Sequence, residues 1–282
     1  MISDPLLSVI ILNYKDIALT SKCVDHVIDS AKKANIETQI IIVDNSAKET
    51  AKELKNVLPD DINIIENLEN QGFSKANNQG ILASKGKYVL LLNNDAFIDL
   101  ECLKTGIEYI KNDENCGIWA PKLLNEDGTF QVSFACLPSL KGLVWMYILM
   151  KDYSCYHDMN EWKEPKNVGS VIGAFMLMKK EIIEEVGLLD EDYFFTGEDV
   201  DYCKRLHESG FKVIYDPRCS IVHIGGASQD KDWNNDPYLH NLVILYFRKN
   251  HGVFKAFLSK VIIFVGLKFR KAFVRYTKLK KD

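Results

Sequence analysis

The sequence lacks several patterns that would assign a function on their own. Its seven cysteines form no C-x-x-C pair and no paired spacing, which argues against a zinc-binding module. No G-x-G-x-x-G motif follows the first hydrophobic run, and no G-x-x-x-x-G-K-S/T motif occurs. Glycine-rich phosphate-binding loops are therefore excluded. We expect the scattered cysteines to be buried free thiols in a reducing compartment rather than disulfides.

Membrane-spanning and targeting signals are also missing. No stretch reaches the roughly 18 uninterrupted apolar residues of a transmembrane helix. Residues 1–12 (MISDPLLSVIIL) carry an acid where a secretory signal needs basic residues, and their apolar run is short. We therefore expect a cytoplasmic protein, and 282 residues are enough for one large domain with a sizeable core.

Acidic residues are absent from one long C-terminal segment. Residues 253–281 contain nine Lys or Arg and no Asp or Glu, and because the whole chain has a formal charge of −4, the remainder carries −13. A body this acidic argues against binding nucleic acid. Aromatic and aliphatic residues alternate with the cations, which predicts that residues 253–282 contact an anionic membrane surface, at the inner face of the cell membrane. The alternative is a terminal helix that packs on the domain and solvates its basic face.

Apolar strands alternate with helices through the first hundred residues. The strands lack polar alternation, which is typical of a mostly parallel central sheet with helices on both faces. We expect an α/β catalytic domain at 1–236 and a basic, amphipathic helical segment at 237–282. The expected strands are 7–12, 39–44, 62–66, 87–95, 169–180, 212–217 and 219–228, and the helices nearest the N-terminus are 18–34, 48–57 and 74–84. Residues 138–162 are rich in aromatics and have no clear period, and we expect them to shape the acceptor site.

Polar residues follow the first four of these strands. Parallel sheets bind ligands beyond the carboxyl ends of their strands, so these residues are candidates for a binding site. Asn and Asp also start turns and cap helices, but their recurrence at one edge favours binding. The residues are Asn13, Tyr14, Asp44, Asn67, Asn93, Asn94 and Asp95.

Asp95 is the candidate metal ligand. Mg²⁺ and Mn²⁺ in nucleotide sites are held by one or two carboxylates together with substrate phosphates. The alternative role, capping the helix near Leu100, is better suited to Asp99. His223 ends a later strand and precedes two glycines. A lone histidine is more often structural, but His223 becomes a second metal ligand if it faces the same edge as Asp95.

The segment TGEDVD, residues 196–201, concentrates three carboxylates at the start of a helix. Thr196 is predicted to be the N-cap, and Asp201 is predicted to form a surface ion pair with Arg205. Neither role explains Glu198 and Asp199. An aspartate at a helix N-terminus stays ionised, as a general base must before it accepts a proton.

Six segments in this order resemble glycosyltransferase family 2, in its bacterial rhamnosyltransferase-like branch, over roughly residues 7–250. They are SVIILNY, IIVDNS, NLENQGFSKANNQGI, YVLLLNNDAF, GAFMLMKKEIIEEVGLLDEDYF and GEDVDYCKRLHESGFKVIY. The resemblance implies a nucleotide-sugar-binding α/β domain of the glycosyltransferase A type.

The resemblance also implies roles for individual residues. Asp199 matches the catalytic base, with Glu198 as a supporting acid and the second candidate. Asp95 matches the last acid of the D-x-D metal motif and His223 a metal ligand, whereas Asn93 stands where the first acid often is. Gly173, Ala174 and Phe175 resemble the wall beside the acceptor. The implied donor-binding residues are Asn13, Tyr14, Asp44, Asn67, Gly72, Asn78, Asn93 and Asn94.

The implied activity is an inverting, Mn²⁺- or Mg²⁺-dependent transfer of a sugar. The donor is a nucleotide-diphospho-sugar, and the acceptor is a glycan or lipid-linked glycan in surface polysaccharide synthesis. A sugar-1-phosphate nucleotidyltransferase would need a glycine-rich, basic loop after the first strand, which LNYKDIALTS lacks. A non-catalytic glycan- or nucleotide-binding protein on the same fold is the second alternative, favoured only by Asn93.

Overall fold

The structure is a computed structural model that describes residues 4–279 except 47–49, 152–153 and 226–235, with side chains described up to residue 270. The described residues fall into two compact units. One lies within Met1–Phe134 and Asp158–Gly225, and the other within Ala135–His157 and Gly226–Asp282. Residues 135–157 thus group with the C-terminal helix rather than with the sheet.

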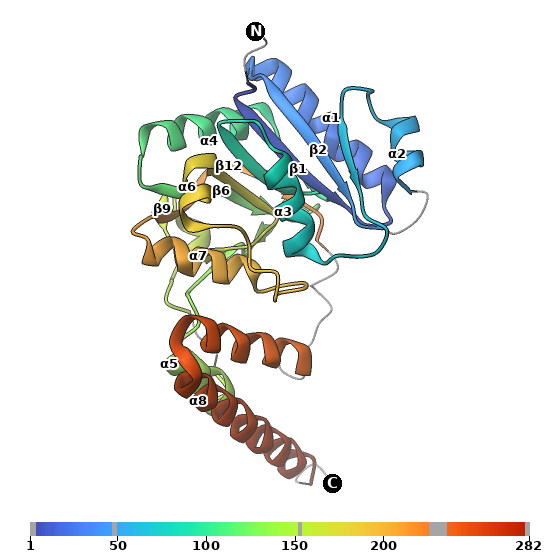
Figure 1. Ribbon diagram of the computed structural model, residues 1–282. Coiled ribbons are helices and arrows are strands. Elements are labelled where there is room, and N and C mark those ends of the chain that lie inside the picture. The colour runs from blue at the N-terminus through green and yellow to red at the C-terminus, as the bar shows by residue number, and fades with distance from the viewer. Residues whose placement is uncertain (1–3, 47–49, 152–153, 226–235, 280–282) are drawn as a thin grey trace. The chain divides into compact units, whose positions relative to one another are not determined.

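The first unit is built on a twisted sheet with the strand order β3-β2-β1-β4-β11-β6-β12-β5 (Figure 1). The strands β1 to β4 run parallel, β11 is antiparallel to β4 and β6, and β12 is parallel to β6. The expected mostly parallel sheet is confirmed. The strands are β1 (Leu7–Asn13), β2 (Thr38–Asp44), β3 (Asn63–Glu66), β4 (Tyr88–Asn93), β5 (Ala96–Phe97), β6 (Cys116–Leu124), β7 (Phe130–Gln131), β8 (Phe134–Ala135), β9 (Lys166–Asn167), β10 (Ser170–Val171), β11 (Phe175–Lys179) and β12 (Lys212–His223).

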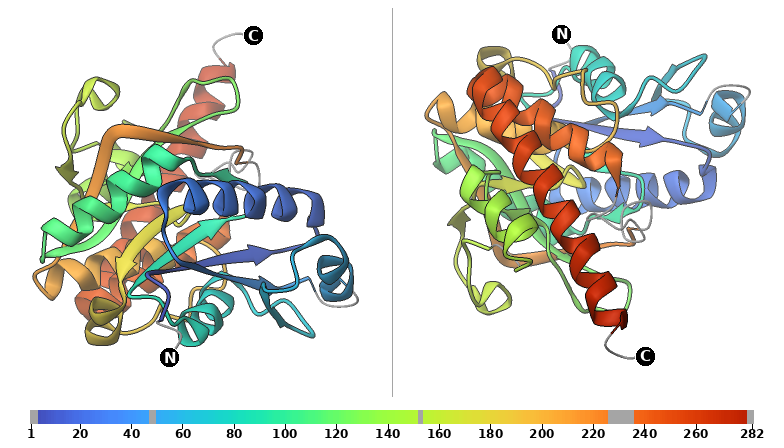
Figure 2. Two further views of the ribbon diagram at one scale, coloured as in Figure 1. Left: turned by 90° about the horizontal axis from the view of Figure 1, so that it is seen from above. Right: turned by 90° about the horizontal axis from the view of Figure 1, so that it is seen from below.

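Helices cover both faces of this sheet, as expected from its apolar strands. Helices α1 and α4 lie side by side on one face, and α3 packs against β1 and β2 from the other (Figure 2). The helices of this unit are α1 (Ile17–Ala34), α2 (Thr50–Val57), α3 (Phe73–Ala83), α4 (Leu100–Asn112), the 3₁₀ turn η2 (Met159–Glu161), α6 (Lys180–Val186) and α7 (Glu198–Glu208). Asp99 caps α4 by accepting a hydrogen bond from the Cys102 backbone N–H at 2.8 Å, as predicted.

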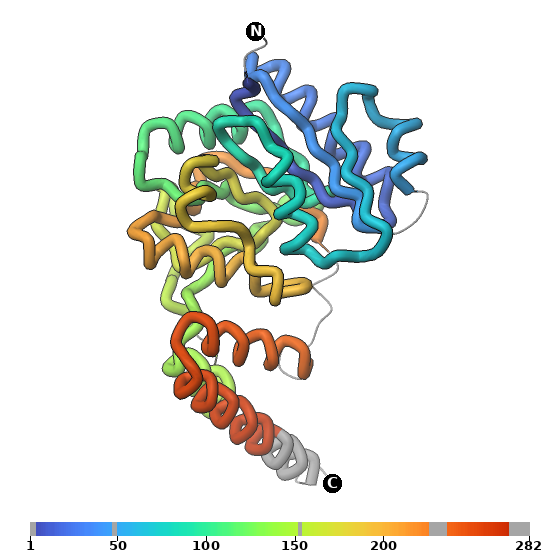
Figure 3. The backbone as a smooth tube through the Cα atoms, in the orientation of Figure 1, coloured from blue at the N-terminus to red at the C-terminus, as the bar shows by residue number. Residues whose placement is uncertain are grey.

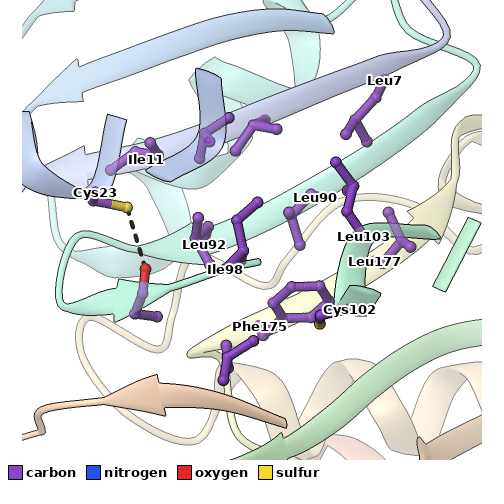
Figure 4. Packing of buried hydrophobic residues seen from close by; sticks show 14 of the residues in the cluster. Leu7, Ile11, Cys23, Leu90, Leu92, Ile98, Cys102, Leu103, Phe175 and Leu177 are labelled. Atoms are coloured by element: carbon purple, nitrogen blue, oxygen red, sulfur yellow. Dashed lines mark hydrogen bonds between the residues drawn. The ribbon is translucent and has the colours of Figure 1, made fainter. Parts of the chain in front are cut away.

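The core follows from the alternation of side chains along buried strands. Leu7 and Ile11 of β1 face the same side as Leu90 and Leu92 of β4, and they meet α1 and α4 (Figure 4). The Cys23 thiol of α1 lies in this layer and donates to the Ala96 carbonyl oxygen at 3.3 Å. Because β1 and β4 are paired and parallel, their carboxyl ends lie at the same edge of the sheet.

Strand β12 corrects one sequence expectation. The predicted strands 212–217 and 219–228 are, over the described residues, a single strand, Lys212–His223, whose pairing with β6 shifts register between Asp216 and Ser220. Residues 226–228 of this prediction lie outside the described residues. Pro217 lies in this shift, where its missing N–H costs no ladder hydrogen bond. The continuous strand carries His223 to the same edge as the end of β4.

The second unit is helical. It contains α5 (Leu140–Leu143), a short π-helix η1 (Val144–Ile148), and α8 (Pro237–Leu279), which begins near the expected residue 237. Asp236 caps α8 by accepting from the Tyr238 backbone N–H at 2.8 Å. Gly252 has φ 85° and breaks α8 into two helical parts, as the backbone tube shows (Figure 3).

The cysteines depart in one respect from the expectation of free thiols. Cys136 and Cys155 are joined by a disulfide within the second unit. Sequence spacing could not show this, because the two residues meet only through the fold of residues 135–157. The other five cysteines are free and buried, as predicted: Cys23, Cys102, Cys116, Cys203 and Cys219.

Candidate active site

The ends of β1 and β2 are joined by a network of buried polar side chains. The Asn13 amide donates to the Asp44 carboxylate at 2.9 Å and to the Ser46 hydroxyl at 3.1 Å. The Thr20 hydroxyl donates to the side-chain oxygen of Asn13 at 2.8 Å and accepts from the side-chain amide of Asn94 at 3.0 Å. Buried polar groups are costly unless paired, so this network holds the edge rigid. It brings together three of the predicted donor-binding residues.

Tyr14 differs from its neighbours in the network because its side chain is 51% exposed. It follows Asn13 at the end of β1, and the Lys15 ammonium lies 5.0 Å from the centre of its ring. An exposed ring at this edge offers a flat surface on which a nucleotide base can stack.

The segment before α3 is fixed at the same edge by amide contacts. Asn67 exchanges hydrogen bonds with Gln79 at 2.8 and 2.9 Å and also donates to Asn45 at 3.3 Å. Gly72 has φ 80°, and a Cβ atom there would lie 2.5 Å from the Phe194 carbonyl oxygen. Only glycine fits this approach, which joins the start of α3 to the loop that leads into α7.

Asn78 of α3 holds the loop before α7 in place through hydrogen bonds of its side chain. Its amide donates to the Leu189 carbonyl and to Glu191, and its carbonyl accepts from the Leu189 N–H, at 2.9 to 3.0 Å. Asn78 is 2% exposed. The structure thus gives this predicted donor-binding residue a positioning role.

Asp95 and His223 meet at this edge, although 128 positions separate them in the sequence. The His223 Nε2 atom lies 3.3 Å from the Asp95 Oδ1 atom, and the Gly225 N–H donates to Oδ2 at 3.1 Å. Burial acts to raise the pKa of Asp95, but the hydrogen bond and charge of His223, together with backbone N–H donors such as that of Gly225, outweigh it, so the pKa lies below its usual value. The condition for His223 to act with Asp95 is therefore met.

Gln131 orients the His223 ring, a role that the sequence did not reveal. Its Oε1 atom lies 2.7 Å from Nδ1, and its amide nitrogen donates to Asn125 at 3.0 Å. Because an amide oxygen only accepts, Nδ1 carries the hydrogen. With Nδ1 so bonded, Nε2 can donate to the Asp95 carboxylate when the ring is protonated, and in the neutral ring its lone pair can bind a cation beside that carboxylate.

The Asp95–His223 pair fits a divalent metal in the chemistry of its donors. Imidazole nitrogen and carboxylate oxygen both suit Mn²⁺, and carboxylate suits Mg²⁺. Among the described residues, no group of three or more His, Cys, Asp or Glu could enclose a metal ion. A cation held here would therefore take its remaining ligands from a substrate diphosphate and water.

Asp199 lies at the start of α7 and is held by backbone amides. Its Oδ2 atom accepts from the Gly173 N–H at 3.1 Å, and its Oδ1 atom from the Val200 N–H at 2.8 Å. Burial raises the pKa of Asp199, and these N–H groups oppose that rise. The carboxylate is oriented by fixed groups rather than by a mobile cation.

The Gly173–Ala174 segment connects Asp199 to the end of β4. The Gly173 N–H donates to the Asp199 carboxylate. The backbone carbonyl of the following residue, Ala174, accepts from the Asn93 N–H at 3.0 Å. Asn93 is two residues before Asp95. Asp199 and Asp95 therefore lie along the same edge of the sheet.

Two residues of the predicted acceptor wall are buried. Ala174 and Phe175 are 2% and 1% exposed, and the Phe175 ring packs edge-on to Trp119 with centroids 5.7 Å apart. Their side chains support the edge of the sheet from within the core. Gly173, whose N–H reaches Asp199, is the member of this trio at the candidate site.

The start of α7 corrects the predicted cap. The N-cap is Gly197, with φ 100° and no side-chain hydrogen bond, and Thr196 precedes it with φ 74°. A β-branched residue at positive φ is strained, and such strain persists where surrounding structure enforces it. The turn sets the direction in which the two acids leave the backbone.

Glu198 is buried and only partly satisfied. It is 4% exposed, and its Oε2 atom has no hydrogen-bond partner. Burial and the charge of Asp199 raise the pKa of Glu198 well above its usual value. The two adjacent acids thus differ in environment, because Asp199 has backbone N–H donors on both oxygens.

Glu198→Gln should stabilise the protein at neutral pH. A carboxyl with a raised folded pKa binds its proton more tightly in the folded state, so stability falls as pH rises above the unfolded value of about 4.3. Glutamine removes this loss. Urea unfolding at several pH values should show a difference between variant and wild type that grows from pH 4 to pH 8; a constant difference would contradict the assignment.

The Asp201–Arg205 pair forms, but it is not at the surface as predicted. Arg205 Nε donates to Asp201 Oδ2 at 3.0 Å, and Asp201 is 2% exposed. The guanidinium also donates to the carbonyl oxygens of Val186 and Leu188 at 3.1 and 2.8 Å. The pair therefore ties the loop after α6 to α7.

Arg205→Met should destabilise the fold without removing any group from the edge of the sheet. The change leaves a buried carboxylate without its cation, which typically costs about 3–5 kcal/mol. Arg205 is partly exposed, so we expect about 3 kcal/mol. The free energy of unfolding in urea measures this, and Lys111→Met, at an exposed position near the end of α4, is the control. A change of less than about 0.5 kcal/mol, the size of an ordinary surface substitution, would contradict the role.

Comparison with known proteins agrees with this geometry. The family model "Glycosyl transferase family 2" matches residues 8–187. The hexosyltransferase Agl10 of low-salt glycan biosynthesis in Haloferax volcanii is 25% identical over 231 residues, covering 77% of this chain and 65% of Agl10. The dTDP-rhamnosyl transferase RfbF of Shigella flexneri is 27% identical over 214 residues, covering 74% of this chain and 67% of RfbF.

A third relative is named for a lipid-linked acceptor. It is the N-acetylglucosaminyl-diphospho-decaprenol L-rhamnosyltransferase of Mycobacterium tuberculosis, 27% identical over 124 residues, covering 41% of this chain and 40% of the relative. The chain thus spans about two thirds or less of the length of these three relatives.

Solved glycosyltransferases share the fold. GalNAc-T7 with UDP, GalNAc and Mn²⁺ superposes with a TM-score of 0.60 at 17% identity, covering 86% of this chain and 48% of its own. The mannosyltransferase PcManGT of Pyrobaculum calidifontis, in complex with GDP-Man and Mn²⁺, gives 0.59 at 15% identity, covering 96% and 76%. The architecture is that of glycosyltransferase A enzymes, and the family match extends over more than half of the sequence. The chain belongs to glycosyltransferase family 2, as a rhamnosyltransferase-like member.

Proposed function

We propose that this glycosyltransferase carries out an inverting transfer from a nucleotide-diphospho-sugar to a hydroxyl of its acceptor, with Asp199 as the catalytic base. The observation that carries the proposal is the position of Asp199. Its carboxylate is bound to the Gly173 N–H, next to the backbone contact that joins Ala174 to Asn93. A base placed there faces a donor bound at the carboxyl ends of β1, β2 and β4.

The proposed chemistry is a single displacement. Asp199 accepts the proton of the acceptor hydroxyl as the acceptor oxygen bonds to the anomeric carbon. The bond from that carbon to the diphosphate breaks, and its electron pair leaves with the nucleoside diphosphate. One displacement from the opposite face inverts the anomeric centre, as in inverting hydrolases.

We propose that Asp95 and His223 hold Mn²⁺ or Mg²⁺ in this site. When bound, the ion would neutralise charge on the departing diphosphate. Asp95 supplies the anionic ligand, and Gln131 keeps the His223 ring turned toward it. Asn93 gives the site one carboxylate fewer than a D-x-D motif, so the lone pair of His223 is the second protein donor.

The donor contacts that we propose follow from exposure and pairing. Tyr14 stacks on the base, and Asp44 and Asn94 contact the ribose and the diphosphate from the network behind them. Asn13, Asn67 and Gly72 shape the same edge of the sheet through the contacts described above.

We also propose that the acceptor is a glycan, or a lipid-linked glycan, in surface polysaccharide synthesis. The relative named for a decaprenol-linked acceptor supports this class, as does the cationic C-terminal segment. No described helix is long and apolar enough to cross a membrane. We propose a peripheral location at the inner face of the cell membrane.

Donor turnover separates the enzyme from a non-catalytic binding protein on the same fold. UDP-, dTDP- and GDP-sugars are first screened for thermal stabilisation of the protein with Mn²⁺. The stabilising donor is then incubated with a membrane glycolipid fraction, and release of nucleoside diphosphate is measured. Acceptor-dependent release is the expected result. Stabilisation by a donor without any turnover would favour the binding protein.

A further inference from the structure

The part of α8 after Gly252 has two opposite faces. On one face Ala256, Ser259, Ile263 and Gly266 recur every three or four residues and are buried. A Cβ atom at Gly266 would lie 2.4 Å from the Tyr147 carbonyl oxygen. This face is therefore packed against η1 within the second unit.

The other face carries large apolar side chains in solvent. Val253, Phe254, Phe257, Val261 and Phe264, which we call the apolar stripe, are 77%, 73%, 61%, 40% and 58% exposed. With 3.6 residues per turn, their positions centre on the side of the helix roughly opposite the packed residues. A contiguous exposed apolar surface of this kind marks an interaction site.

Cations border the apolar stripe. Lys255 and Lys260 lie between its members in the sequence, and the Lys268 ammonium is 4.4 Å from the centre of the Phe264 ring. Arg270 follows, and no Asp or Glu occurs from 253 to 281. The remaining cations of this segment are outside the described side chains or residues: Lys271, Arg275, Lys278, Lys280 and Lys281.

We propose that the apolar stripe binds an anionic lipid surface, with its aromatic side chains at the boundary between headgroups and acyl chains. A helix with an apolar face bordered by Lys and Arg lies in the plane of such an interface. The lysines meet the lipid phosphates while their stems remain along the helix. This inference deepens the proposed peripheral location, names its surface, and is independent of the transfer chemistry.

Other occupants fit this surface less well. A second copy packed stripe to stripe would bring the cations of both helices together with no acid in either segment to pair with them. A nucleic acid would supply phosphates for the cations but would leave the phenylalanines without an apolar partner. A bilayer offers both anionic headgroups for the lysines and an apolar layer for the exposed aromatic side chains.

Vesicle flotation tests the proposal with the full chain. Vesicles of phosphatidylcholine alone are compared with vesicles that also contain phosphatidylglycerol. Wild type should float with the anionic vesicles. The triple substitution Phe254→Ser, Phe257→Ser and Phe264→Ser should weaken binding at least about 1000-fold, because each buried aromatic contributes about tenfold or more.

A charge variant and a matched control complete the design. Lys255→Gln, Lys260→Gln and Lys268→Gln together should weaken binding to anionic vesicles by about 100-fold, or about fivefold per cation, and salt should mimic this loss. The control is Leu82→Ser with Val57→Ser, two exposed apolar residues of the first unit, 73% and 54% exposed. It should float like wild type.

Three results would overturn the proposal. They are wild type that does not float with anionic vesicles, a triple aromatic variant that floats like wild type, and a stripe-dependent dimer in sedimentation without flotation. All variants should keep the melting temperature of wild type, because the changed side chains are exposed. Donor turnover in solution should also be unchanged, so loss of flotation and loss of chemistry are separate outcomes.

Discussion

Asp199→Asn should lower acceptor-dependent turnover by about 10²–10⁴-fold, because an amide cannot accept the proton of the acceptor hydroxyl. The amide oxygen can still accept the Gly173 N–H, which now bonds the carboxylate at 3.1 Å, so the loop should keep its position. Donor affinity, measured by calorimetry with the nucleoside diphosphate and Mn²⁺, should stay within about twofold of wild type, a difference well below 1 kcal/mol. The effect should therefore appear in kcat rather than in donor binding.

Asp192→Asn is the matched control for this substitution. Asp192 is an exposed carboxylate in the loop before α7, and its replacement should leave turnover unchanged. If Asp199→Asn keeps full turnover, Asp199 is not the base. In that event Glu198→Asp and Glu198→Gln would show whether the neighbouring acid accepts the proton instead.

The second large effect is expected at Asp95. Asp95→Asn should abolish Mn²⁺-dependent binding of the nucleoside diphosphate and, with it, turnover, because the substitution removes the anionic ligand of the Asp95–His223 pair. Gln131→Leu should lower metal affinity about 10–100-fold, as loss of a hydrogen bond that orients a ligating histidine typically does. Calorimetric titration of Mn²⁺ in the presence of nucleoside diphosphate measures both.

The graded pattern distinguishes a metal site from a structural ion pair. Asp60→Asn, an exposed carboxylate after α2, is the control and should bind Mn²⁺ like wild type. If Asp95→Asn binds metal and nucleotide unchanged, the metal lies elsewhere on the chain. If Asp95→Asn fails but Gln131→Leu does not, His223 does not contribute through the orientation that we describe.

The parallel half of the fold could be predicted from sequence because its signals are local. Continuous apolar runs and the helical pattern between them place β1 to β4 within two residues of the expected bounds. Strand β6 was not predicted, since Gly117 and Pro121 argue against a central strand. The structure accommodates Pro121 opposite Asp216, where β12 shifts its register.

The candidate site was predictable in part for the same reason. Asn13, Asp44 and Asp95 follow recognisable strands, so their common edge follows from the topology. The partners that determine their chemistry come from distant segments. Nothing in the local sequence shows that Gln131 faces His223, 92 residues away, or that the Asp201–Arg205 pair is covered by the loop after α6.

The turn at Thr196 shows a different limit. Its residue type and the acids that follow predict an N-cap, and the structure instead places Thr196 at φ 74° and caps the helix with Gly197. Local preference was overridden by the contacts of the preceding loop, in which Phe73 donates to the Phe194 carbonyl at 2.7 Å. Such a contact depends on the packing of α3, which cannot be predicted from residues 196–201 alone.

Anomalous scattering from crystals soaked with Mn²⁺ and a nucleoside diphosphate would show whether the edge formed by the ends of β1, β2 and β4 binds the donor and faces Asp199. We expect an anomalous peak bonded to Asp95 Oδ1 and His223 Nε2, with the diphosphate on its open side and the base beside Tyr14. A peak bonded to other residues, with nucleotide bound away from this edge, would contradict this expectation.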